Sequence, residues 1–196
     1  MLQGKRIALG ITASHCTYDE IIPVIDSLIE AGATVVPVIT HSVLTAATRF
    51  GTGEEWIRRI EEATGEKVIS TIVGAEPFGP TAPVDCMIIA PMTGNSLSRF
   101  ANASTDSPVL MGAKATLRNG SPVLLGISTN DALGLNGVNI MKLLNMKNVF
   151  FIPFGQDDPF NKPNSLISDF SLMVPATVAA LEKRQLQPLL IIHEKK

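Results

Sequence analysis

The sequence predicts an α/β protein in which a doubly wound, parallel sheet lies between two layers of helices. Short runs that are apolar on both faces, as buried parallel strands are, alternate along the chain with segments of helical periodicity. This alternation is typical of a parallel sheet that is covered by helices on both faces. The 196 residues contain no repeat, no low-complexity tract and no domain boundary, so we expect a single domain over residues 1–196.

Five apolar runs predict the main strands, and a sixth, weaker run predicts a brief one. Pro37 indicates either an edge position for its strand or a local irregularity, because proline has no N–H to donate to a neighbouring strand. The expected main strands are 6–11, 34–39, 84–90, 122–127 and 148–152, and the brief one is 67–73.

Helical periodicity and glycine or asparagine stops predict the helices between these strands. After the second strand, Leu44, Ala47 and Phe50 predict one helix that continues to Phe50. A loop is expected at 153–164, and with the last helix and an apolar tail it makes up a C-terminal segment at 153–196. The other expected helices are 20–31, 54–64, 94–103, 107–118, 138–144 and 168–184.

The composition excludes several classes of protein. Hydrophobic residues make up 45% of the chain and charged residues 17%, which is apolar for a soluble monomer and predicts a homo-oligomer. No apolar run is long enough for a membrane span, and the start of the chain does not resemble a signal peptide. A net charge of −2, with scattered basic residues, argues against nucleic-acid binding.

The chain has two cysteines and three histidines, in no spacing typical of a metal site, so we expect no metal. Cys86 lies inside an apolar run and is expected to be an unreactive core residue. Two lone cysteines fit a reducing cytoplasm, and we expect the protein to be cytoplasmic.

Four expected strand ends carry hydroxyl groups, amides or glycine, and in an open α/β sheet these ends meet at one edge, where ligands bind. Hydroxyl groups and the N–H groups of helix N-termini suit a phosphate, so we expect a small anionic ligand. Helix capping alone would explain any one of these turns equally well. The candidate ligand-binding residues are Gly10, Thr12, Ala13, Ser14, Thr40, Ser42, Pro91, Met92, Thr93, Gly94, Asn95, Ser96, Ser128, Thr129 and Asn130.

The first turn, at 10–14, lacks the GxGxxG pattern, and no GxxxxGK[ST] motif occurs, so a mononucleotide is favoured over a dinucleotide or a P-loop ligand. Asn95 and Ser96 are the strongest candidates for ligand contact. His15 and His41 could contact an anion or be structural, and Arg99 could bind a carboxylate or form a surface ion pair. No residue is assigned a catalytic role.

The segment 90–106 reads Ala-Pro-x-Thr-x-Asn-x-x-x-x-x-Ala-Asn-x-x-x-Asp. This pattern resembles the signature of the FMN-binding flavoproteins, a family that includes homo-oligomeric cysteine decarboxylases, and the match extends from about Lys5 to Phe154. The resemblance implies a Rossmann-like flavoprotein fold. It also implies that the first turn and this segment bind FMN, often at an interface between two copies of the chain.

Two departures separate the chain from the decarboxylases of that family. The decarboxylases have an active-site histidine shortly before the strand that is expected here at 84–90, whereas 69–83 contains no histidine. They also have a Pro-x-Met-Asn run where this chain has Ser-Thr-Asn-Asp at 128–131. The resemblance therefore does not extend to decarboxylation.

The segments 107–111, 113–120, 128–136 and 152–159 resemble a narrower branch of the family, the dipicolinate synthases of spore-forming bacteria. This resemblance implies oxidation of a dihydrodipicolinate-level intermediate to dipicolinate during sporulation, together with a separate A subunit that binds NADP. Two alternatives are a non-catalytic scaffold or activator with a vestigial flavin pocket and an independent FMN-dependent decarboxylase.

Overall fold

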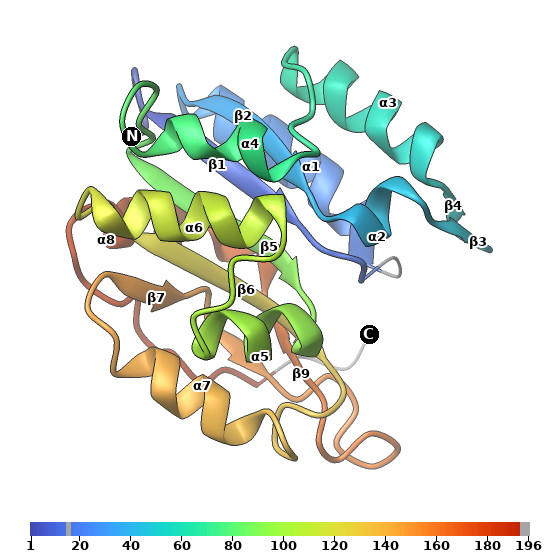
Figure 1. Cartoon of the computed structure of the whole chain (residues 1–196). Helices are drawn as coiled ribbons and strands as arrows, with labels where there is room; N and C mark the ends of the chain where they lie inside the picture. The colour runs from blue at the N-terminus through green and yellow to red at the C-terminus, as the bar shows by residue number, and fades with distance from the viewer. Residues whose placement is uncertain (15–16, 193–196) are drawn as a thin grey trace.

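A computed structural model describes residues 1–14 and 17–192 and has a mostly parallel sheet at its centre (Figure 1). The strands of the sheet lie in the order β2-β1-β5-β6-β9-β8, and β7 also pairs with β6. The pairs β1–β2, β1–β5, β5–β6 and β6–β7 are parallel, while β9 is antiparallel to β6 and to β8. The strands are β1 (Arg6–Ile11), β2 (Thr34–Ile39), β5 (Cys86–Met92), β6 (Val123–Thr129), β7 (Val149–Phe151), β8 (Phe154–Gly155) and β9 (Leu166–Ser168).

Helices cover both faces of this sheet and bury two apolar clusters against it. One cluster includes Leu97, Val109 and Ile140 of α5, α6 and α7, and the other includes Ile21 of α1 and Met173 of α8. The three-layer, doubly wound arrangement that the sequence predicts is confirmed. The helices are α1 (Tyr18–Glu30), α2 (His41–Leu44), α3 (Gly53–Thr64), α4 (Ile72–Ala75), α5 (Gly94–Ala101), α6 (Pro108–Arg118), α7 (Gly137–Leu144) and α8 (Met173–Leu181), with short 3-10 turns at Glu76–Phe78 and Phe170–Leu172.

Of the two arrangements that Pro37 indicated, the structure has the edge position, since β2 lies at one end of the strand order. The brief strand expected at 67–73 is reduced to a single bridge between Val38 and Ile69. There the Ile69 N–H donates to the Pro37 carbonyl, and the Ile39 N–H donates to the Ile69 carbonyl. The prediction of a strand was therefore largely wrong, because α4 begins at Ile72 and ends the pairing.

The helix expected to run to Phe50 ends at Leu44, and a small hairpin of β3 (Ala47–Thr48) and β4 (Gly51–Thr52) takes its place. The hairpin returns the chain so closely that a Cβ on Gly53 would lie 2.2 Å from the Leu44 carbonyl oxygen. Thr52 then begins α3 with a capping box, in which its side chain and that of Glu55 each accept a backbone N–H of the other residue. This close return of the backbone displaces the predicted helix.

The C-terminal segment also differs from the prediction. The expected helix at 168–184 is shortened to α8, and β8 forms inside the expected loop at 153–164. Ser168 explains where β9 pairs, because its hydroxyl accepts the Ile127 N–H at 3.0 Å and donates to the Ile152 carbonyl at 3.2 Å. The apolar tail adds one bridge, between Phe154 and Leu190.

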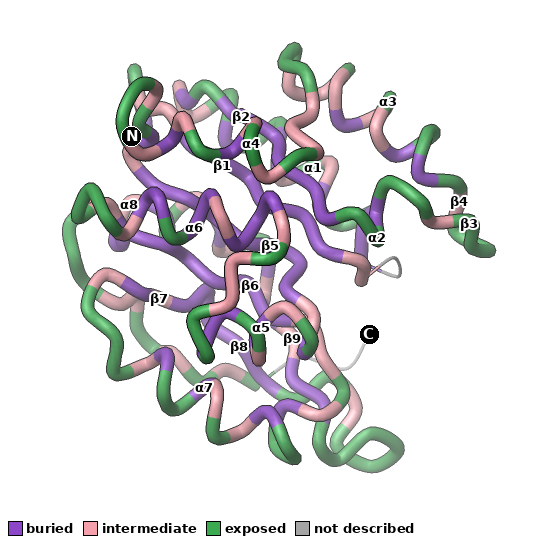
Figure 2. Tube along the Cα trace, in the orientation of Figure 1, coloured by how far each residue is buried: buried purple, intermediate pink, exposed green. Residues whose placement is uncertain are grey.

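Burial follows the layers, with the central strands buried and the outer helix faces exposed (Figure 2). Cys86 on β5 is fully buried, which confirms that it is a core residue, and burial raises the pKa of its thiol to about 12. In the part of the chain that the structure describes, no helix is long and apolar enough to cross a membrane. Within these same residues, no three His, Cys, Asp or Glu side chains form a group that could bind a metal ion.

Candidate functional site

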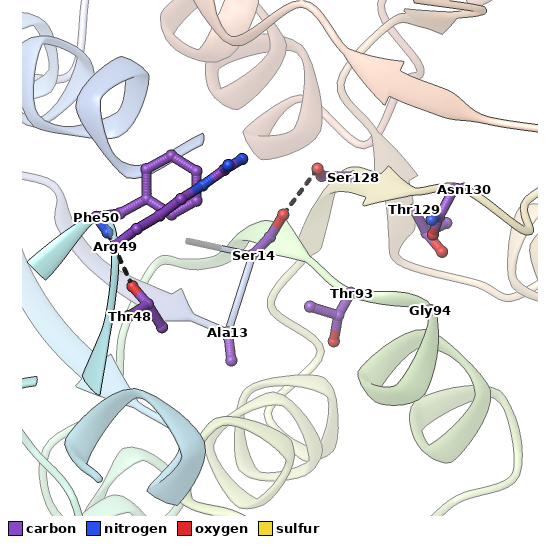
Figure 3. Close-up of a pocket in the computed structure, with 10 residues that line it drawn as sticks. All are labelled: Ala13, Ser14, Thr48, Arg49, Phe50, Thr93, Gly94, Ser128, Thr129 and Asn130. Atoms are coloured by element: carbon purple, nitrogen blue, oxygen red, sulfur yellow. Dashed lines mark hydrogen bonds between the residues drawn. The ribbon is translucent and has the colours of Figure 1, made fainter. Parts of the chain in front are cut away.

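A pocket of about 480 Å³ opens where the carboxyl ends of β1, β5 and β6 meet the hairpin β3–β4 (Figure 3). The edge of the sheet supplies one wall and the hairpin supplies the other. This is the place where open α/β sheets bind ligands. Ten residues line the pocket: Ala13, Ser14, Thr48, Arg49, Phe50, Thr93, Gly94, Ser128, Thr129 and Asn130.

Thr12 joins the first strand end to the second. Its buried hydroxyl donates to the Pro91 carbonyl at 2.7 Å and accepts the Thr93 N–H at 2.9 Å. The Thr12 carbonyl in turn accepts the Tyr18 hydroxyl at 2.9 Å, which ties the same turn to α1. Thr12 therefore links the ends of β1 and β5, and its hydroxyl is committed to the backbone.

Ser14 joins the first strand end to the third. Its hydroxyl oxygen lies 3.0 Å from that of Ser128, within hydrogen-bond distance, and the close-up shows the two side chains meeting across the pocket (Figure 3). The Ser14 carbonyl accepts the Thr17 N–H and hydroxyl, which fixes the start of the segment that leads into α1. The ends of β1, β5 and β6 thus form one hydrogen-bonded edge.

Gly94 begins α5 in a space too small for a side chain. A Cβ there would lie 2.6 Å from Thr129 Oγ1 and 2.7 Å from both Asn136 Nδ2 and Asp131 Oδ1. Those three side chains are bonded together, because the Asp131 carboxylate accepts the Thr129 hydroxyl and, at 2.8 Å, the Asn136 amide. Only glycine lets the start of α5 pack directly on the end of β6.

The N-terminus of α5 supplies hydrogen-bond donors at the pocket. Thr93 is the N-cap residue, and its hydroxyl accepts the Ser96 N–H at 3.3 Å. The N–H groups of Gly94 and Asn95, earlier in the first turn, have no acceptor within the helix. A helix N-terminus of this kind stabilises an anion such as a phosphate.

Thr40 contributes a buried hydroxyl group without a partner. The residue follows β2, is 8% exposed, and donates its N–H to the Ile11 carbonyl at the end of β1. In the described part of the chain, its Oγ1 is one of two buried side-chain polar atoms that have no hydrogen-bond partner. Such atoms are rare in folded proteins, and a bound ligand is one way to satisfy them.

The structure brings seven of the fifteen predicted residues to the pocket wall: Ala13, Ser14, Thr93, Gly94, Ser128, Thr129 and Asn130. Five others lie buried around it and do not line it: Gly10, Thr12, Thr40, Pro91 and Met92. A Cβ on Gly10 would lie 2.8 Å from a Val109 methyl group, so that glycine serves the packing of α6. Ser42 and Asn95 are exposed outside the wall, and Ser96 accepts the Thr93 hydroxyl.

Sequence reasoning missed the hairpin wall, which consists of Thr48, Arg49 and Phe50. The predicted helix placed Phe50 on an inner face but did not bring Arg49 to the strand ends. No local pattern would have found these residues, because the hairpin depends on the tight packing of Gly53 on α2.

Arg99 and His41 do not line the pocket. Arg99 pairs with Asp106 at 3.4 Å, so the surface ion pair is the arrangement that forms. His41 is an exposed first residue of α2, and His15 and Cys16 lie outside the described residues. Arg49 is the only pocket-lining residue with an ionisable side chain in the part of the chain that the structure describes. This wall can bind an anion, but it offers no acid–base pair.

A family model described as Flavoprotein matches residues 1–171. The chain belongs to the Flavoprotein family. The pocket of this flavoprotein fits FMN in two respects: a helix N-terminus faces it, and no carboxylate belongs to its described wall.

Comparisons with individual proteins are more specific. The flavoprotein is 59% identical to the dipicolinate synthase B subunit of Bacillus subtilis (strain 168) over 190 residues, which are 97% of this chain and 95% of the relative. The crystal structure of the dipicolinate synthase B subunit from Bacillus halodurans C superposes with a TM-score of 0.90 at 58% identity, covering 97% of this chain and 98% of the other. The resemblance that the sequence indicated is confirmed.

A more distant structure supports the fold alone. The FMN-dependent cysteine decarboxylase SpaF superposes with a TM-score of 0.67 at 18% identity, covering 92% of this chain and 99% of the other. The fold is therefore shared with an FMN-dependent enzyme.

Proposed function

We propose that this flavoprotein acts as the B subunit of a dipicolinate synthase and binds FMN in the pocket at the ends of β1, β5 and β6. The observation that carries the proposal is the 59% identity to such a B subunit over nearly the whole of both chains. The pocket supports the FMN part of the proposal, because its donors suit a phosphate and its second wall contains an aromatic ring.

Each wall has its own part in holding FMN. The N–H groups at Gly94 and Asn95, with the hydroxyl of Ser14, would bind the phosphate, and Phe50 would lie beside the flavin ring. When bound, FMN would supply a ring system that can accept a hydride. The protein's own contribution is to orient the ligands, because the pocket wall carries no acid–base pair in the described residues.

The partner is the A subunit of the synthase, which would bind NADP. Conversion of a dihydrodipicolinate-level ring to dipicolinate removes one hydride and one proton, and NADP⁺ on the A subunit would be the final acceptor of the hydride. We place this reaction in the cytoplasm of the sporulating cell and expect the flavoprotein itself to be a homo-oligomer.

The spectrum of the purified protein tests FMN binding. A preparation with flavin absorbance bands, or one that gains them when FMN is added, supports the proposal. A colourless preparation that takes up no added FMN would contradict the FMN part of the proposal.

The synthase role is tested by mixing the flavoprotein with the A subunit. An A subunit that makes dipicolinate at full rate on its own would contradict a role for the flavoprotein.

A non-catalytic scaffold is the second candidate, and the absence of an acid–base pair among the described wall residues favours it. The two candidates differ in how they respond to a damaged pocket. With the A subunit present, a pocket variant that no longer binds FMN should stop dipicolinate formation if FMN takes part. The same variant should leave the rate unchanged if the flavoprotein only positions its partner.

A further inference from the structure

The tip of the hairpin β3–β4 places the cationic side chain of Arg49 in the wall of the pocket. Ala47 pairs with Thr52 and Thr48 pairs with Gly51, so Arg49 and Phe50 form the two-residue turn between them. The guanidinium carbon of Arg49 lies 4.7 Å from the centre of the Phe50 ring, and the close-up shows the arginine side chain extended along that ring (Figure 3). The stack restricts the guanidinium before any ligand arrives, which lowers the entropic cost of binding.

The base of the hairpin is fixed to the rest of the fold. The Gly53 N–H donates to the Ala46 carbonyl at 2.7 Å, and the Thr52 N–H donates to the Glu55 carboxylate at 2.7 Å. Near the tip, the Thr48 hydroxyl accepts the Phe50 N–H at 3.1 Å. These hydrogen bonds fix the hairpin, which therefore holds Arg49 at a defined position on the pocket wall.

The charge of Arg49 has no carboxylate partner among the described residues. Three other arginines, Arg59, Arg99 and Arg184, each form an ion pair. The remaining described residues of the pocket wall are uncharged, so the wall carries one formal positive charge. An unpaired guanidinium beside neutral hydrogen-bonding groups favours an anionic ligand.

The pocket offers two different positions for anions, on opposite walls. The start of α5, where Gly94 lines the pocket, presents backbone N–H groups, which suit a phosphate. Arg49 presents a planar fork of N–H donors from the hairpin, and such a fork matches the two oxygens of a carboxylate. A phosphate on α5 leaves the guanidinium for a second anion.

We propose that Arg49 binds a carboxylate of the substrate and makes this pocket selective for flat ring compounds that carry carboxylates. The inference rests on the proposed function, from which the class of substrate is taken. It adds that the flavoprotein itself contacts the substrate and that the contact comes from the hairpin wall.

The test measures dipicolinate binding to the FMN-loaded flavoprotein by calorimetry. Arg49→Gln should weaken this binding by about 10- to 100-fold, the loss expected for a hydrogen-bonded charge pair. The affinity of Arg49→Lys for dipicolinate should lie between those of the wild type and Arg49→Gln, because lysine keeps the charge and loses the planar fork of donors. Arg58→Gln removes the same charge from an exposed residue of α3 outside the pocket and should bind dipicolinate as the wild type does.

A flavin titration of the same variants distinguishes the carboxylate from the phosphate. FMN affinity should stay within about twofold of the wild type in Arg49→Gln, since the phosphate is bound at α5. A parallel loss of FMN affinity would overturn the inference by assigning the guanidinium to the phosphate. A wild-type protein that binds no dipicolinate, or an Arg49→Gln variant that binds it normally, would also overturn it.

Assays in the presence of the A subunit separate this inference from the proposed function. If the two proteins together make no dipicolinate, the proposed function fails, whatever Arg49 does in the binding experiment. If they make dipicolinate and Arg49→Gln keeps the wild-type KM for the dihydro substrate, the Arg49 inference fails alone. The expected result is a raised KM in Arg49→Gln and an unchanged KM in Arg58→Gln.

Discussion

At the scale of single residues, Gly94 determines how close the start of α5 can come to the end of β6. In a Gly94→Ala variant, the new Cβ would meet three mutually bonded side chains at 2.6 to 2.7 Å. Relieving that overlap must shift α5 or break the Asp131 network. We expect a loss of about 1 to 3 kcal/mol in the free energy of unfolding and about a tenfold loss of FMN affinity.

Urea denaturation and a flavin titration measure the two effects. Gly79→Ala is the matched control, because a Cβ there would have its nearest contact at an ordinary 3.5 Å. The control should behave as the wild type in both assays. If Gly94→Ala kept wild-type FMN affinity, the start of α5 would not be part of the ligand site.

Cys86 gives a prediction about pH. Burial raises the pKa of its thiol to about 12, so the native protein keeps it protonated, and unreactive toward thiol reagents, at pH 8. The unfolded chain releases this proton near the ordinary value of 9.0. The contribution of Cys86 to stability is therefore complete below about pH 9 and is lost as the pH rises toward 12.

A Cys16→Ser variant leaves Cys86 as the sole thiol for this measurement. A coloured disulfide reagent should react with it only after guanidinium has unfolded the protein. Rapid reaction of the native variant at pH 8 would show that β5 opens or that the thiol is accessible.

At the scale of elements, Asp85 joins the start of β1 to the start of β5. Its carboxylate accepts the Arg6 N–H and the Lys5 ammonium group, each at 2.9 Å. Partial burial opposes ionisation, but these two hydrogen bonds outweigh it and lower the pKa of Asp85 overall. The carboxylate should therefore stabilise the fold above its unfolded pKa of about 4, and this contribution should disappear as the pH falls through the lower native value.

Asp85→Asn should lower the free energy of unfolding by about 1 kcal/mol at pH 7, a modest loss because the ion pair is partly exposed to solvent. The difference from the wild type should shrink between pH 5 and pH 3, as urea denaturation at several pH values would show. Asp26→Asn, on an exposed position of α1, is the control and should show no such difference. A penalty for Asp85→Asn that did not change with pH would contradict the role of the carboxylate charge.

The elements also show how much of the fold the sequence could predict. The parallel strands were predictable because burial on both faces leaves a continuous apolar run, as in β1 and β2, whose bounds agree with the expected 6–11 and 34–39. The hairpin β3–β4 and the strands β8 and β9 were not, since two or three residues are too few to show a period. Their positions depend on tertiary contacts, such as the Ser168 bridge from Ile127 to Ile152.

The same limit applies to the candidate site. Seven wall residues were predictable, because the carboxyl ends of parallel strands must lie at one edge of the sheet. The hairpin wall was not, because Arg49 reaches the pocket only through the sharp return at Gly53. Whether the fifteen predicted residues bind the ligand stays a prediction, as does the single domain over residues 1–196.

At the scale of the whole molecule, four of the exposed apolar residues lie close together in the sequence, on the segment that leads into α7 and on α7 itself. Leu135 is 88% exposed and Val138 is 74% exposed, and Leu133 and Met141 are exposed beside them. This segment directly follows the end of β6, whose residues line the pocket. Adjacent exposed apolar side chains on a chain that is 45% hydrophobic favour an interface between copies.

We therefore expect the wild-type protein to sediment as a homo-oligomer and a Leu135→Glu/Val138→Glu variant to sediment as a smaller species, because charges would be buried in the interface. Val73→Glu is the control, since Val73 is equally exposed but lies on α4, away from this segment. A wild-type chain that sediments as a monomer would contradict the oligomer. A variant that keeps the wild-type size would place the interface elsewhere.

Since the interface would begin where the pocket wall ends, FMN affinity should fall in the double variant and stay unchanged in Val73→Glu.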